Sequence, residues 1–203
     1  LLAEETPADD EIVLTSGKGY SNVFHADGGN AAFSVMANTL RGVYGTDVLL
    51  ATANSFTGSV LQADYNKKMA VSMIMPNGLM SRQRTMTGAE LKETVRAFVE
   101  GCEGGFVPFN RGSLPVVSGI AVEVKEASGS YTLTGITRNG QPLGDDDTVT
   151  VTCLAAENQM EALLASESGR SLDGDTWVKN RWRDHVSGGG AALAEPENYM
   201  TLR

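Results

Sequence analysis

A change of hydrophobic period in the middle of the chain constrains its fold more than any other feature. Thr87-Gly-Ala-Glu90 is a capping box, in which the threonine hydroxyl and the glutamate carboxylate satisfy free amides of a first helical turn. The buried stripe of this helix is expected at Leu91, Val95, Phe98 and Val99, and Gly101 stops it. The period then switches to two over residues 116–124, 131–137 and 148–154, with turns at Asn139-Gly140 and residues 144–147. This succession predicts an α+β fold, a mixed β-sheet with packed helices.

The first half of the chain predicts one further helix and one buried strand. The run from Ala31 to Gly42 carries apolar side chains at helical spacing, Asn30 can cap it, and Gly42 or Gly45 can end it. The next run, Asp47-Val-Leu-Leu-Ala-Thr-Ala53, is almost continuously apolar, which is typical of a strand buried on both faces.

The two ends of the chain differ from its middle. Residues 1–12 are acidic and proline-containing and are interpreted as a linker, whereas residues 13–203 are predicted to form a single domain. Residues 157–203 are expected to be a helical C-terminal extension, with helices over residues 157–165 and 176–186 before a short extended end. The start lacks the basic and apolar parts of a signal peptide, so we expect a piece cut from a longer polypeptide.

The charge balance limits the kinds of binding partner. The chain has 16 Lys plus Arg against 25 Asp plus Glu, a formal net charge of -9. This balance disfavours nucleic acid, because affinity for nucleic acid depends on basic side chains that neutralise phosphates. A small anionic ligand stays open, because one local positive pocket can outweigh a diffuse negative surface. No apolar run is long enough for a membrane span.

Cysteine and histidine usage predicts no metal site. Cys102 and Cys153 fit two buried thiols or one disulfide, and both alternatives stay open. His25 and His185 lie far apart without neighbours at the spacing of metal ligands. No Ser/His/Asp or Cys/His arrangement can be recognised, so we expect no catalytic residue in this chain.

Three stretches resemble, in order, the C-terminal domain of the 5′-nucleotidase family. They are Met36–Leu50, a helix followed by a strand entering a ligand loop, the segment from Pro76 into Thr87-Gly-Ala-Glu-Leu-Lys92, and Leu114-Pro-Val-Val-Ser-Gly-Ile-Ala-Val-Glu-Val124. With the strand at residues 148–154, the resemblance covers roughly residues 30–160, and its specificity rests on the order and spacing of short motifs.

The resemblance implies a division of labour between two domains of one polypeptide. In that family an N-terminal metallophosphatase domain holds two divalent metals and hydrolyses the substrate. The C-terminal domain holds a nucleoside base between two aromatic rings, which suits any base face. For this chain the resemblance implies no cofactor of its own, an upstream domain as partner, a nucleoside- or nucleotide-like ligand, and an extracellular or cell-surface location.

This chain departs from the family pattern at the positions that grip the nucleotide. The family loop Asn-x-Gly-Gly-Ile-Arg is replaced by residues 52–57, which puts Thr57 at the arginine position. Asn77 follows Pro76 where the family has its first ring, and residues 153–158 lack both the second ring and the family's glycine motif. The resemblance therefore transfers the fold, and the nucleotide site is expected to be diverged.

Eight residues are candidates for ligand binding. Phe56 offers a substitute ring and Thr57 a hydroxyl, although an ordinary buried loop phenylalanine is the simpler interpretation of Phe56. A second loop, residues 104–111, contains two aromatic rings and a guanidinium group close together in sequence, at Phe106, Phe109 and Arg111. The candidates are Asn54, Ser55, Phe56, Thr57, Asn77, Phe106, Phe109 and Arg111.

Several other features have simpler structural interpretations. Arg82 and Arg84 are read as an exposed strand edge rather than an anion site. Residues 145–147 lack the spacing of a calcium loop and are read as a solvated turn, and residues 24–27 as a helix-entry loop. A run of methionines is expected to fill the core: Met69, Met73, Met75, Met80 and Met86.

The leading hypothesis is a substrate-recognition type of domain from a larger secreted phosphohydrolase, with a diverged site and no catalysis of its own. An intact part of a working phosphohydrolase is a second hypothesis, which requires Asp-x-His and Asn-His-Asp/Glu metal motifs upstream of Leu1. A non-enzymatic extracellular interaction module that reuses the fold is a third, and it predicts a large exposed apolar patch.

Overall fold

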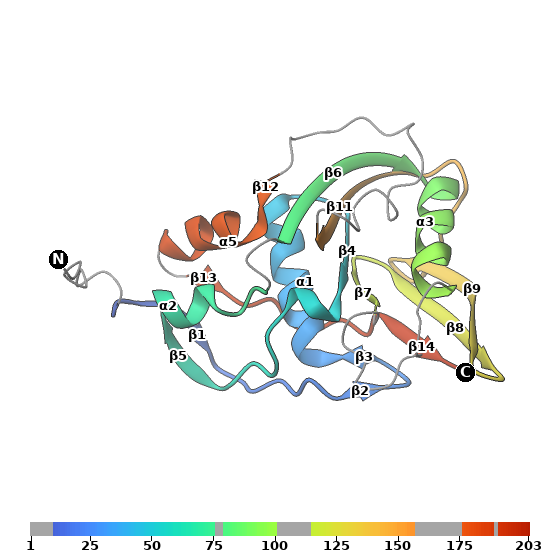
Figure 1. Cartoon of the computed structure of the whole chain (residues 1–203). Helices are drawn as coiled ribbons and strands as arrows, with labels where there is room; N and C mark the ends of the chain where they lie inside the picture. Colours follow the sequence, from blue (N-terminus) through green and yellow to red (C-terminus); the bar gives the residue numbers. More distant parts are fainter. Residues whose placement is uncertain (1–9, 76–78, 101–114, 157–175, 189–190) are drawn as a thin grey trace.

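A five-stranded mixed sheet forms the centre of the structure, a computed structural model that describes residues 10–75, 79–100, 115–156, 176–188 and 191–203 (Figure 1). Its strand order is β12-β6-β11-β4-β7, in which β11 and β4 are parallel and the other neighbours are antiparallel. The bounds are β4 (Val48–Thr52), β6 (Leu79–Thr87), β7 (Pro115–Ser118), β11 (Thr148–Ala156) and β12 (Thr176–Trp177). Residues 48–51 of β4 are fully buried, as its continuous apolar run predicts.

Two smaller sheets flank the central one. The first has the order β10-β9-β8-β14 and the second the order β13-β1-β5. The bounds of the first are β8 (Ala121–Ala127), β9 (Ser130–Arg138), β10 (Gln141–Pro142) and β14 (Met200–Leu202). Those of the second are β1 (Ile12–Ser16), β5 (Ala63–Asn66) and β13 (Ala191–Ala192), and β2 (Phe24–His25) pairs with β3 (Gly29–Asn30) outside both sheets. With the helices packed on them, these sheets confirm the α+β prediction.

Helix α1 (Ala31–Tyr44) runs through the middle of the molecule and packs on β4 and β7. The side chain of Asn30 caps it by accepting a 3.0 Å hydrogen bond from the Phe33 amide. Gly45 ends it in the left-handed conformation at φ 66°, which glycine adopts without steric cost. Both predicted signals of this helix are confirmed.

Helix α3 (Gly88–Glu100) begins at the predicted capping box. The Glu90 carboxylate accepts from the Thr87 amide at 2.8 Å, and the Glu90 amide donates to the Thr87 hydroxyl at 3.2 Å. Gly88 has no alternative here, because a Cβ atom would lie 1.8 Å from the Gly144 carbonyl oxygen. Leu91, Val95 and Val99 are buried as expected, whereas Phe98 is only half-buried.

The prediction of a single strand over residues 116–124 is wrong, because the chain turns at Gly119 and forms two strands. Strand β7 ends at Ser118 in the central sheet, and β8 starts at Ala121 in another sheet. Gly119 turns the chain with φ 83°, and a Cβ atom there would lie 2.1 Å from the Asp47 carbonyl oxygen. The alternating pattern continues across the break, so the periodicity alone hides it.

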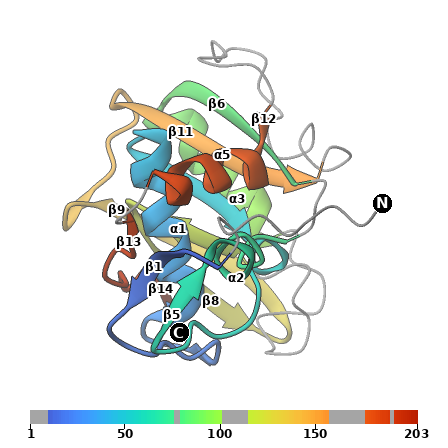
Figure 2. The same ribbon diagram turned by 90° about the vertical axis from the view of Figure 1, so that its left-hand side faces the viewer.

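The C-terminal part also differs from its prediction. Helix α5 (Val178–Ser187) starts two residues later than expected, because Thr176 and Trp177 pair with β6 instead. After α5 the described residues are extended, with β13 and β14 as their strands, and the helix expected over residues 157–165 lies outside the described part of the chain. Figure 2 shows α5 lying over α1 and beside the short helix α2 (Lys67–Val71).

Three smaller predictions need correction. Strand β1 already begins at Ile12, the last residue of the expected linker. Arg82 and Arg84 are half-buried rather than exposed, although among the described strands β12 pairs with the outer side of β6 only at Met80 and Ser81. Met73 and Met86 fill the core, whereas Met69 and Met75 are exposed by 44% and 45%.

Candidate functional site

The carboxyl end of β4 leads into the predicted ligand loop. A 3-10 turn, η2 (Ala53–Ser55), comes first and holds Asn54 at the surface and Ser55 in the interior. The Phe56 side chain is only 4% exposed and lies in the hydrophobic core, as expected for an ordinary buried loop phenylalanine rather than a ring that faces a ligand. The Thr57 hydroxyl donates to the Ser72 carbonyl, and the Thr57 amide donates to the Met73 carbonyl at 3.1 Å. This loop is therefore bound to the segment after α2 through its own polar groups.

The other four ligand-binding candidates, Asn77, Phe106, Phe109 and Arg111, lie outside the described residues.

The aspartates of residues 145–147 form a turn. Asp147 accepts from the Gly144 amide at 2.8 Å and Asp145 pairs with Lys92, in keeping with a solvated turn. In the part of the chain that the structure describes, no group of three or more His, Cys, Asp or Glu side chains could hold a metal ion.

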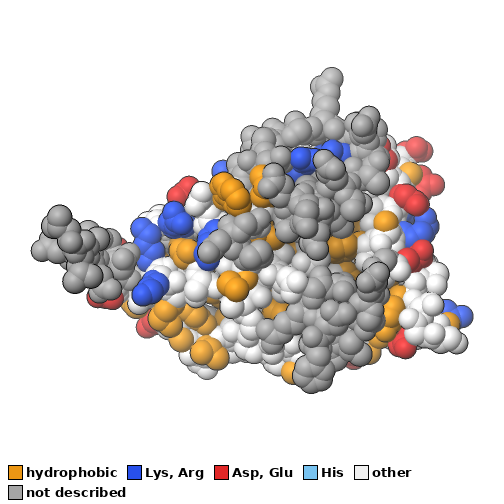
Figure 3. Space-filling view, in the orientation of Figure 1, with side chains coloured by type: hydrophobic (Ala, Val, Ile, Leu, Met, Phe, Trp, Pro, Cys, Tyr) orange, Lys and Arg blue, Asp and Glu red, His pale blue; other side chains and the backbone are white. Residues whose placement is uncertain are grey.

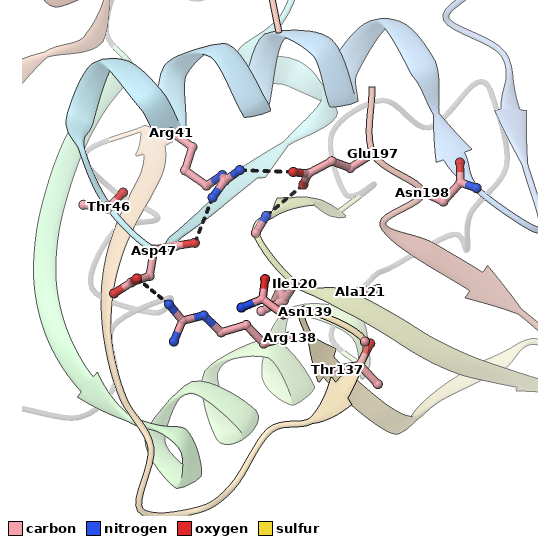
Figure 4. A pocket seen from close by; sticks show the side chains of 12 residues that line it. Arg41, Thr46, Asp47, Ile120, Ala121, Thr137, Arg138, Asn139, Glu197 and Asn198 are labelled. Carbon is pink, nitrogen blue, oxygen red and sulfur yellow. Dashed lines mark hydrogen bonds and ion pairs between the residues drawn. The ribbon is translucent and has the colours of Figure 1, made fainter. Parts of the chain in front are cut away.

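A polar hollow of about 340 Å³ lies at the opposite, amino end of β4 (Figure 4). Five parts of the chain supply its walls: the end of α1, the start of β4, the β7–β8 turn, the β9–β10 turn and the segment before β14. Its charged side chains are Arg41, Asp47, Arg138 and Glu197. No pattern in the sequence links these residues, because Arg41 and Glu197 are 156 positions apart.

Arg41 and Glu197 form the first pair in this hollow. Arg41 Nη2 lies 3.0 Å from Glu197 Oε1, and Arg41 Nε donates to Ser118 Oγ at 2.9 Å. The second carboxylate oxygen of Glu197 accepts from the Gly119 amide at 3.0 Å. A single glutamate therefore binds the end of α1 and the β7–β8 turn to the C-terminal segment.

Asp47 and Arg138 form the second pair. Burial opposes the charge of Asp47, but two hydrogen bonds from Thr150 and the positive charges of Arg138 and Arg41 outweigh it. The pKa of the Asp47 carboxyl group is consequently lower than its ordinary value. Both Thr150 bonds are 2.8 Å long, from the amide and from the hydroxyl to Asp47 Oδ2.

The charged side chains of the hollow are paired with one another. Each arginine faces a carboxylate, so the hollow offers no uncompensated positive charge to an anion. Among the described residues, its lining includes no serine, cysteine or histidine. The arrangement is a clamp that joins α1, β4, the β7–β8 turn and the C-terminal segment.

Cys153 is a free thiol in the interior of β11. Burial raises its pKa to about 12, although Arg84 and Arg82 lower it in part. The thiol is therefore protonated and unreactive at neutral pH. Of the two alternatives for the cysteines, the buried thiol holds for Cys153, and Cys102 lies outside the described residues.

The fold of this chain matches part of several solved structures. The structure matches the 5′-nucleotidase precursor of Thermus thermophilus with a TM-score of 0.69 and 13% identity, over 95% of this chain and 39% of that chain. It matches the NAD nucleotidase of Haemophilus influenzae with a TM-score of 0.67 and 16% identity, over 97% of this chain and 39% of that one. The sulfate thiohydrolase SoxB of Thermus thermophilus matches with a TM-score of 0.65 and 12% identity, over 95% and 35% of the two chains.

The likeness confirms the resemblance to the 5′-nucleotidase family at the level of the fold. No family model and no curated protein sequence matches the chain. The chain spans about two fifths of the length of the solved chains that it matches. Among the described residues, no helix is long and apolar enough to cross a membrane.

Proposed function

We propose that this chain is the substrate-recognition type of domain of a larger, secreted 5′-nucleotidase-like phosphohydrolase, with a diverged nucleotide site and no catalysis of its own. The likeness over 95% of this chain to 39% of a 5′-nucleotidase carries the proposal. Hydrolysis would belong to an upstream metallophosphatase domain, because the resemblance assigns the two divalent metals to that domain.

The contacts at the end of β4 support a diverged site. Phe56, the nearest substitute for a stacking ring, packs in the core, and the Thr57 hydroxyl already donates to a backbone carbonyl. Asn77 stands where the family has a ring, and an asparagine amide offers a base no aromatic face. Residues 153–158, the stretch of the family's second ring, contain no aromatic side chain, so a nucleoside there would lack both rings of the family's pair.

Phosphate release from adenosine monophosphate tests the proposal. The 203-residue chain alone, supplied with Mn²⁺ or Mg²⁺, is expected to release no phosphate above a blank. The longer natural polypeptide is expected to carry Asp-x-His and Asn-His-Asp/Glu motifs upstream and to hydrolyse a phosphate ester. Metal-dependent release by the chain alone would contradict the lack of catalysis. A longer polypeptide without these motifs would favour the interaction module instead.

A further inference from the structure

Helix α5 presents two cations beside its buried stripe. Val178, Trp182 and Val186 recur every four residues and are buried, so Lys179 and Arg183 form the adjacent stripe. Trp182 fixes the helix in place, because its Nε1 donates a 2.8 Å hydrogen bond to the Ala70 carbonyl in α2. This buried bond sets the distance between the two helices.

Helix α2 adds two lysines at its start. The Asn66 side chain caps the helix by accepting from the Met69 amide at 2.9 Å, which places Lys67 and Lys68 in its first turn. A hollow of about 450 Å³ is lined by Lys67, Lys68, Val71 and Ser72 together with the two cations of α5. Four positive side chains from two helices thus share one concave surface.

A second hollow adjoins the first and contains an aromatic ring. It has a volume of about 550 Å³ and is lined by Trp177, Lys179, Asn180 and Arg183. The Trp177 side chain is 48% exposed, and its backbone is held in β12 against Met80 of β6. Because Lys179 and Arg183 line both hollows, cations and ring belong to one continuous surface, which we term the basic groove.

Basic side chains are the only charged groups among the described residues that line the basic groove. Within the described ranges, no Asp or Glu lines either hollow. Among the described residues, Lys67, Lys68 and Arg183 take part in no ion pair, whereas Lys18, Arg41, Lys92 and Arg138 each face a carboxylate. Blue side chains gather at the end of the molecule that holds α2 and α5 (Figure 3). Like charges so placed repel one another, and a bound anion would relieve that repulsion.

We propose that the basic groove binds a small molecule that contains both a chain of several phosphate groups and a flat ring. Guanidinium and ammonium groups suit phosphate oxygens, the arginine through its fork and the lysines as point charges. The exposed face of Trp177 can stack a flat ring at the end of the row of cations. Each hollow is large enough to hold part of a small molecule. The proposal does not rest on the function proposed above, because none of residues 54–57 lines the groove.

Tryptophan fluorescence gives a direct measurement of binding. The chain has two tryptophans, and Trp182 is fully buried, so a ligand in the groove quenches Trp177 alone. Adenosine triphosphate, tripolyphosphate and adenosine are titrated separately at low ionic strength with a metal chelator present. The triphosphate is expected to bind and to quench, tripolyphosphate to compete with it, and adenosine to bind at least roughly tenfold more weakly.

Charge variants locate the site. The double variant Lys68→Gln/Arg183→Gln is expected to weaken triphosphate binding roughly fivefold to twentyfold, because each exposed cation contributes a modest factor. Lys125→Gln is the matched control, since this exposed lysine lies on β8 in another sheet. Circular dichroism confirms that each variant is folded, and Trp177→Phe removes the quenching while calorimetry still detects the phosphates.

The outcomes separate clearly. Binding that weakens in the double variant and persists in Lys125→Gln supports the proposal. Absence of quenching and of heat at millimolar triphosphate overturns it, as does a loss that is equal in the double variant and the control. Quenching of Trp177 by adenosine that is as strong as quenching by the triphosphate also overturns it, whereas adenosine binding without quenching, like phosphate release, bears only on the function proposed above.

Discussion

The rings of Phe33 and Phe56 lie 5.9 Å apart between centroids, with 35° between their planes. Phe33 belongs to α1 and Phe56 to the loop after η2, and both side chains are buried in the core. Tilted aromatic pairs at this distance are mutually attractive beyond the area that they bury. The loop that would hold a ligand in the family thus uses its aromatic residue to attach itself to a helix.

Phe56→Ala is expected to lower the free energy of unfolding by about 3–5 kcal/mol, because the change leaves a cavity in the core. Urea unfolding measures this loss. Asn54→Ala, two residues earlier and exposed, is the matched control and should change stability by less than about 0.5 kcal/mol. A small effect of Phe56→Ala would show that the ring lies outside the core.

Glu197→Ala is expected to destabilise the chain by about 1–3 kcal/mol, because it removes the charged acceptor of the Arg41 guanidinium and the acceptor of the Gly119 amide. Glu195→Ala is the control, since its pair with Lys18 is more than half exposed on both sides. Exposed pairs contribute less than about 1 kcal/mol. Equal losses in the two variants, measured by urea unfolding, would contradict the clamp.

Gly119→Ala tests the close contact that separates β7 from β8. The new methyl group would meet the Asp47 carbonyl oxygen at 2.1 Å in a left-handed backbone conformation. Gly129 has almost the same φ, 81°, but a Cβ atom there would have nothing within 4 Å, so Gly129→Ala isolates the backbone strain. Thermal unfolding should show Gly119→Ala to be less stable than Gly129→Ala by at least about 2 kcal/mol. Similar melting temperatures would contradict the contact.

Asp47 makes stability depend on pH in a defined direction. Its folded-state pKa is below the ordinary value of 3.8, so the ionised group stabilises the fold above 3.8, and this contribution is lost as pH falls through the folded value. Asp47→Asn should therefore be less stable than the natural chain at pH 7, and the difference should shrink below pH 3.8. Unfolding free energies of both proteins at pH 7 and pH 3 check this. A difference that does not vary with pH would show that the charge of Asp47 contributes nothing.

Local patterns predicted the elements whose causes are local. The capping box of α3 and the Asn30 cap of α1 act within four residues, so the sequence contains all that is needed. The Asn139-Gly140 turn is equally local, since both residues adopt positive φ between β9 and β10. For the same reason the resemblance could be drawn from short motifs such as Thr87-Gly88.

The remaining features depend on residues far apart in the chain. The break at Gly119 arises from the Asp47 carbonyl, and the start of α5 is set by the pairing of Trp177 with β6. The clamp and the basic groove each combine segments separated by more than 100 residues. No periodicity reports such pairs, because burial and charge pairing are decided only when the segments meet.

The basic groove also qualifies the conclusions drawn from net charge. A formal net charge of -9 disfavours extended polyanions, yet it averages over surfaces that differ. In the described residues, carboxylates pair with the arginines of the clamp but line neither hollow of the groove. The composition was compatible with a local positive pocket but could not locate it, because the pocket forms only where α5 packs on α2.

Calorimetric titration of adenosine into the 203-residue chain tests whether the nucleotide site is diverged. Adenosine carries the base and no phosphate, so it reports on the positions that hold the ring pair in the family and only weakly on the basic groove. No binding heat is expected at micromolar concentrations, because Phe56 packs in the core and Asn77 stands in a ring position. Saturable binding with a micromolar dissociation constant would contradict a diverged site.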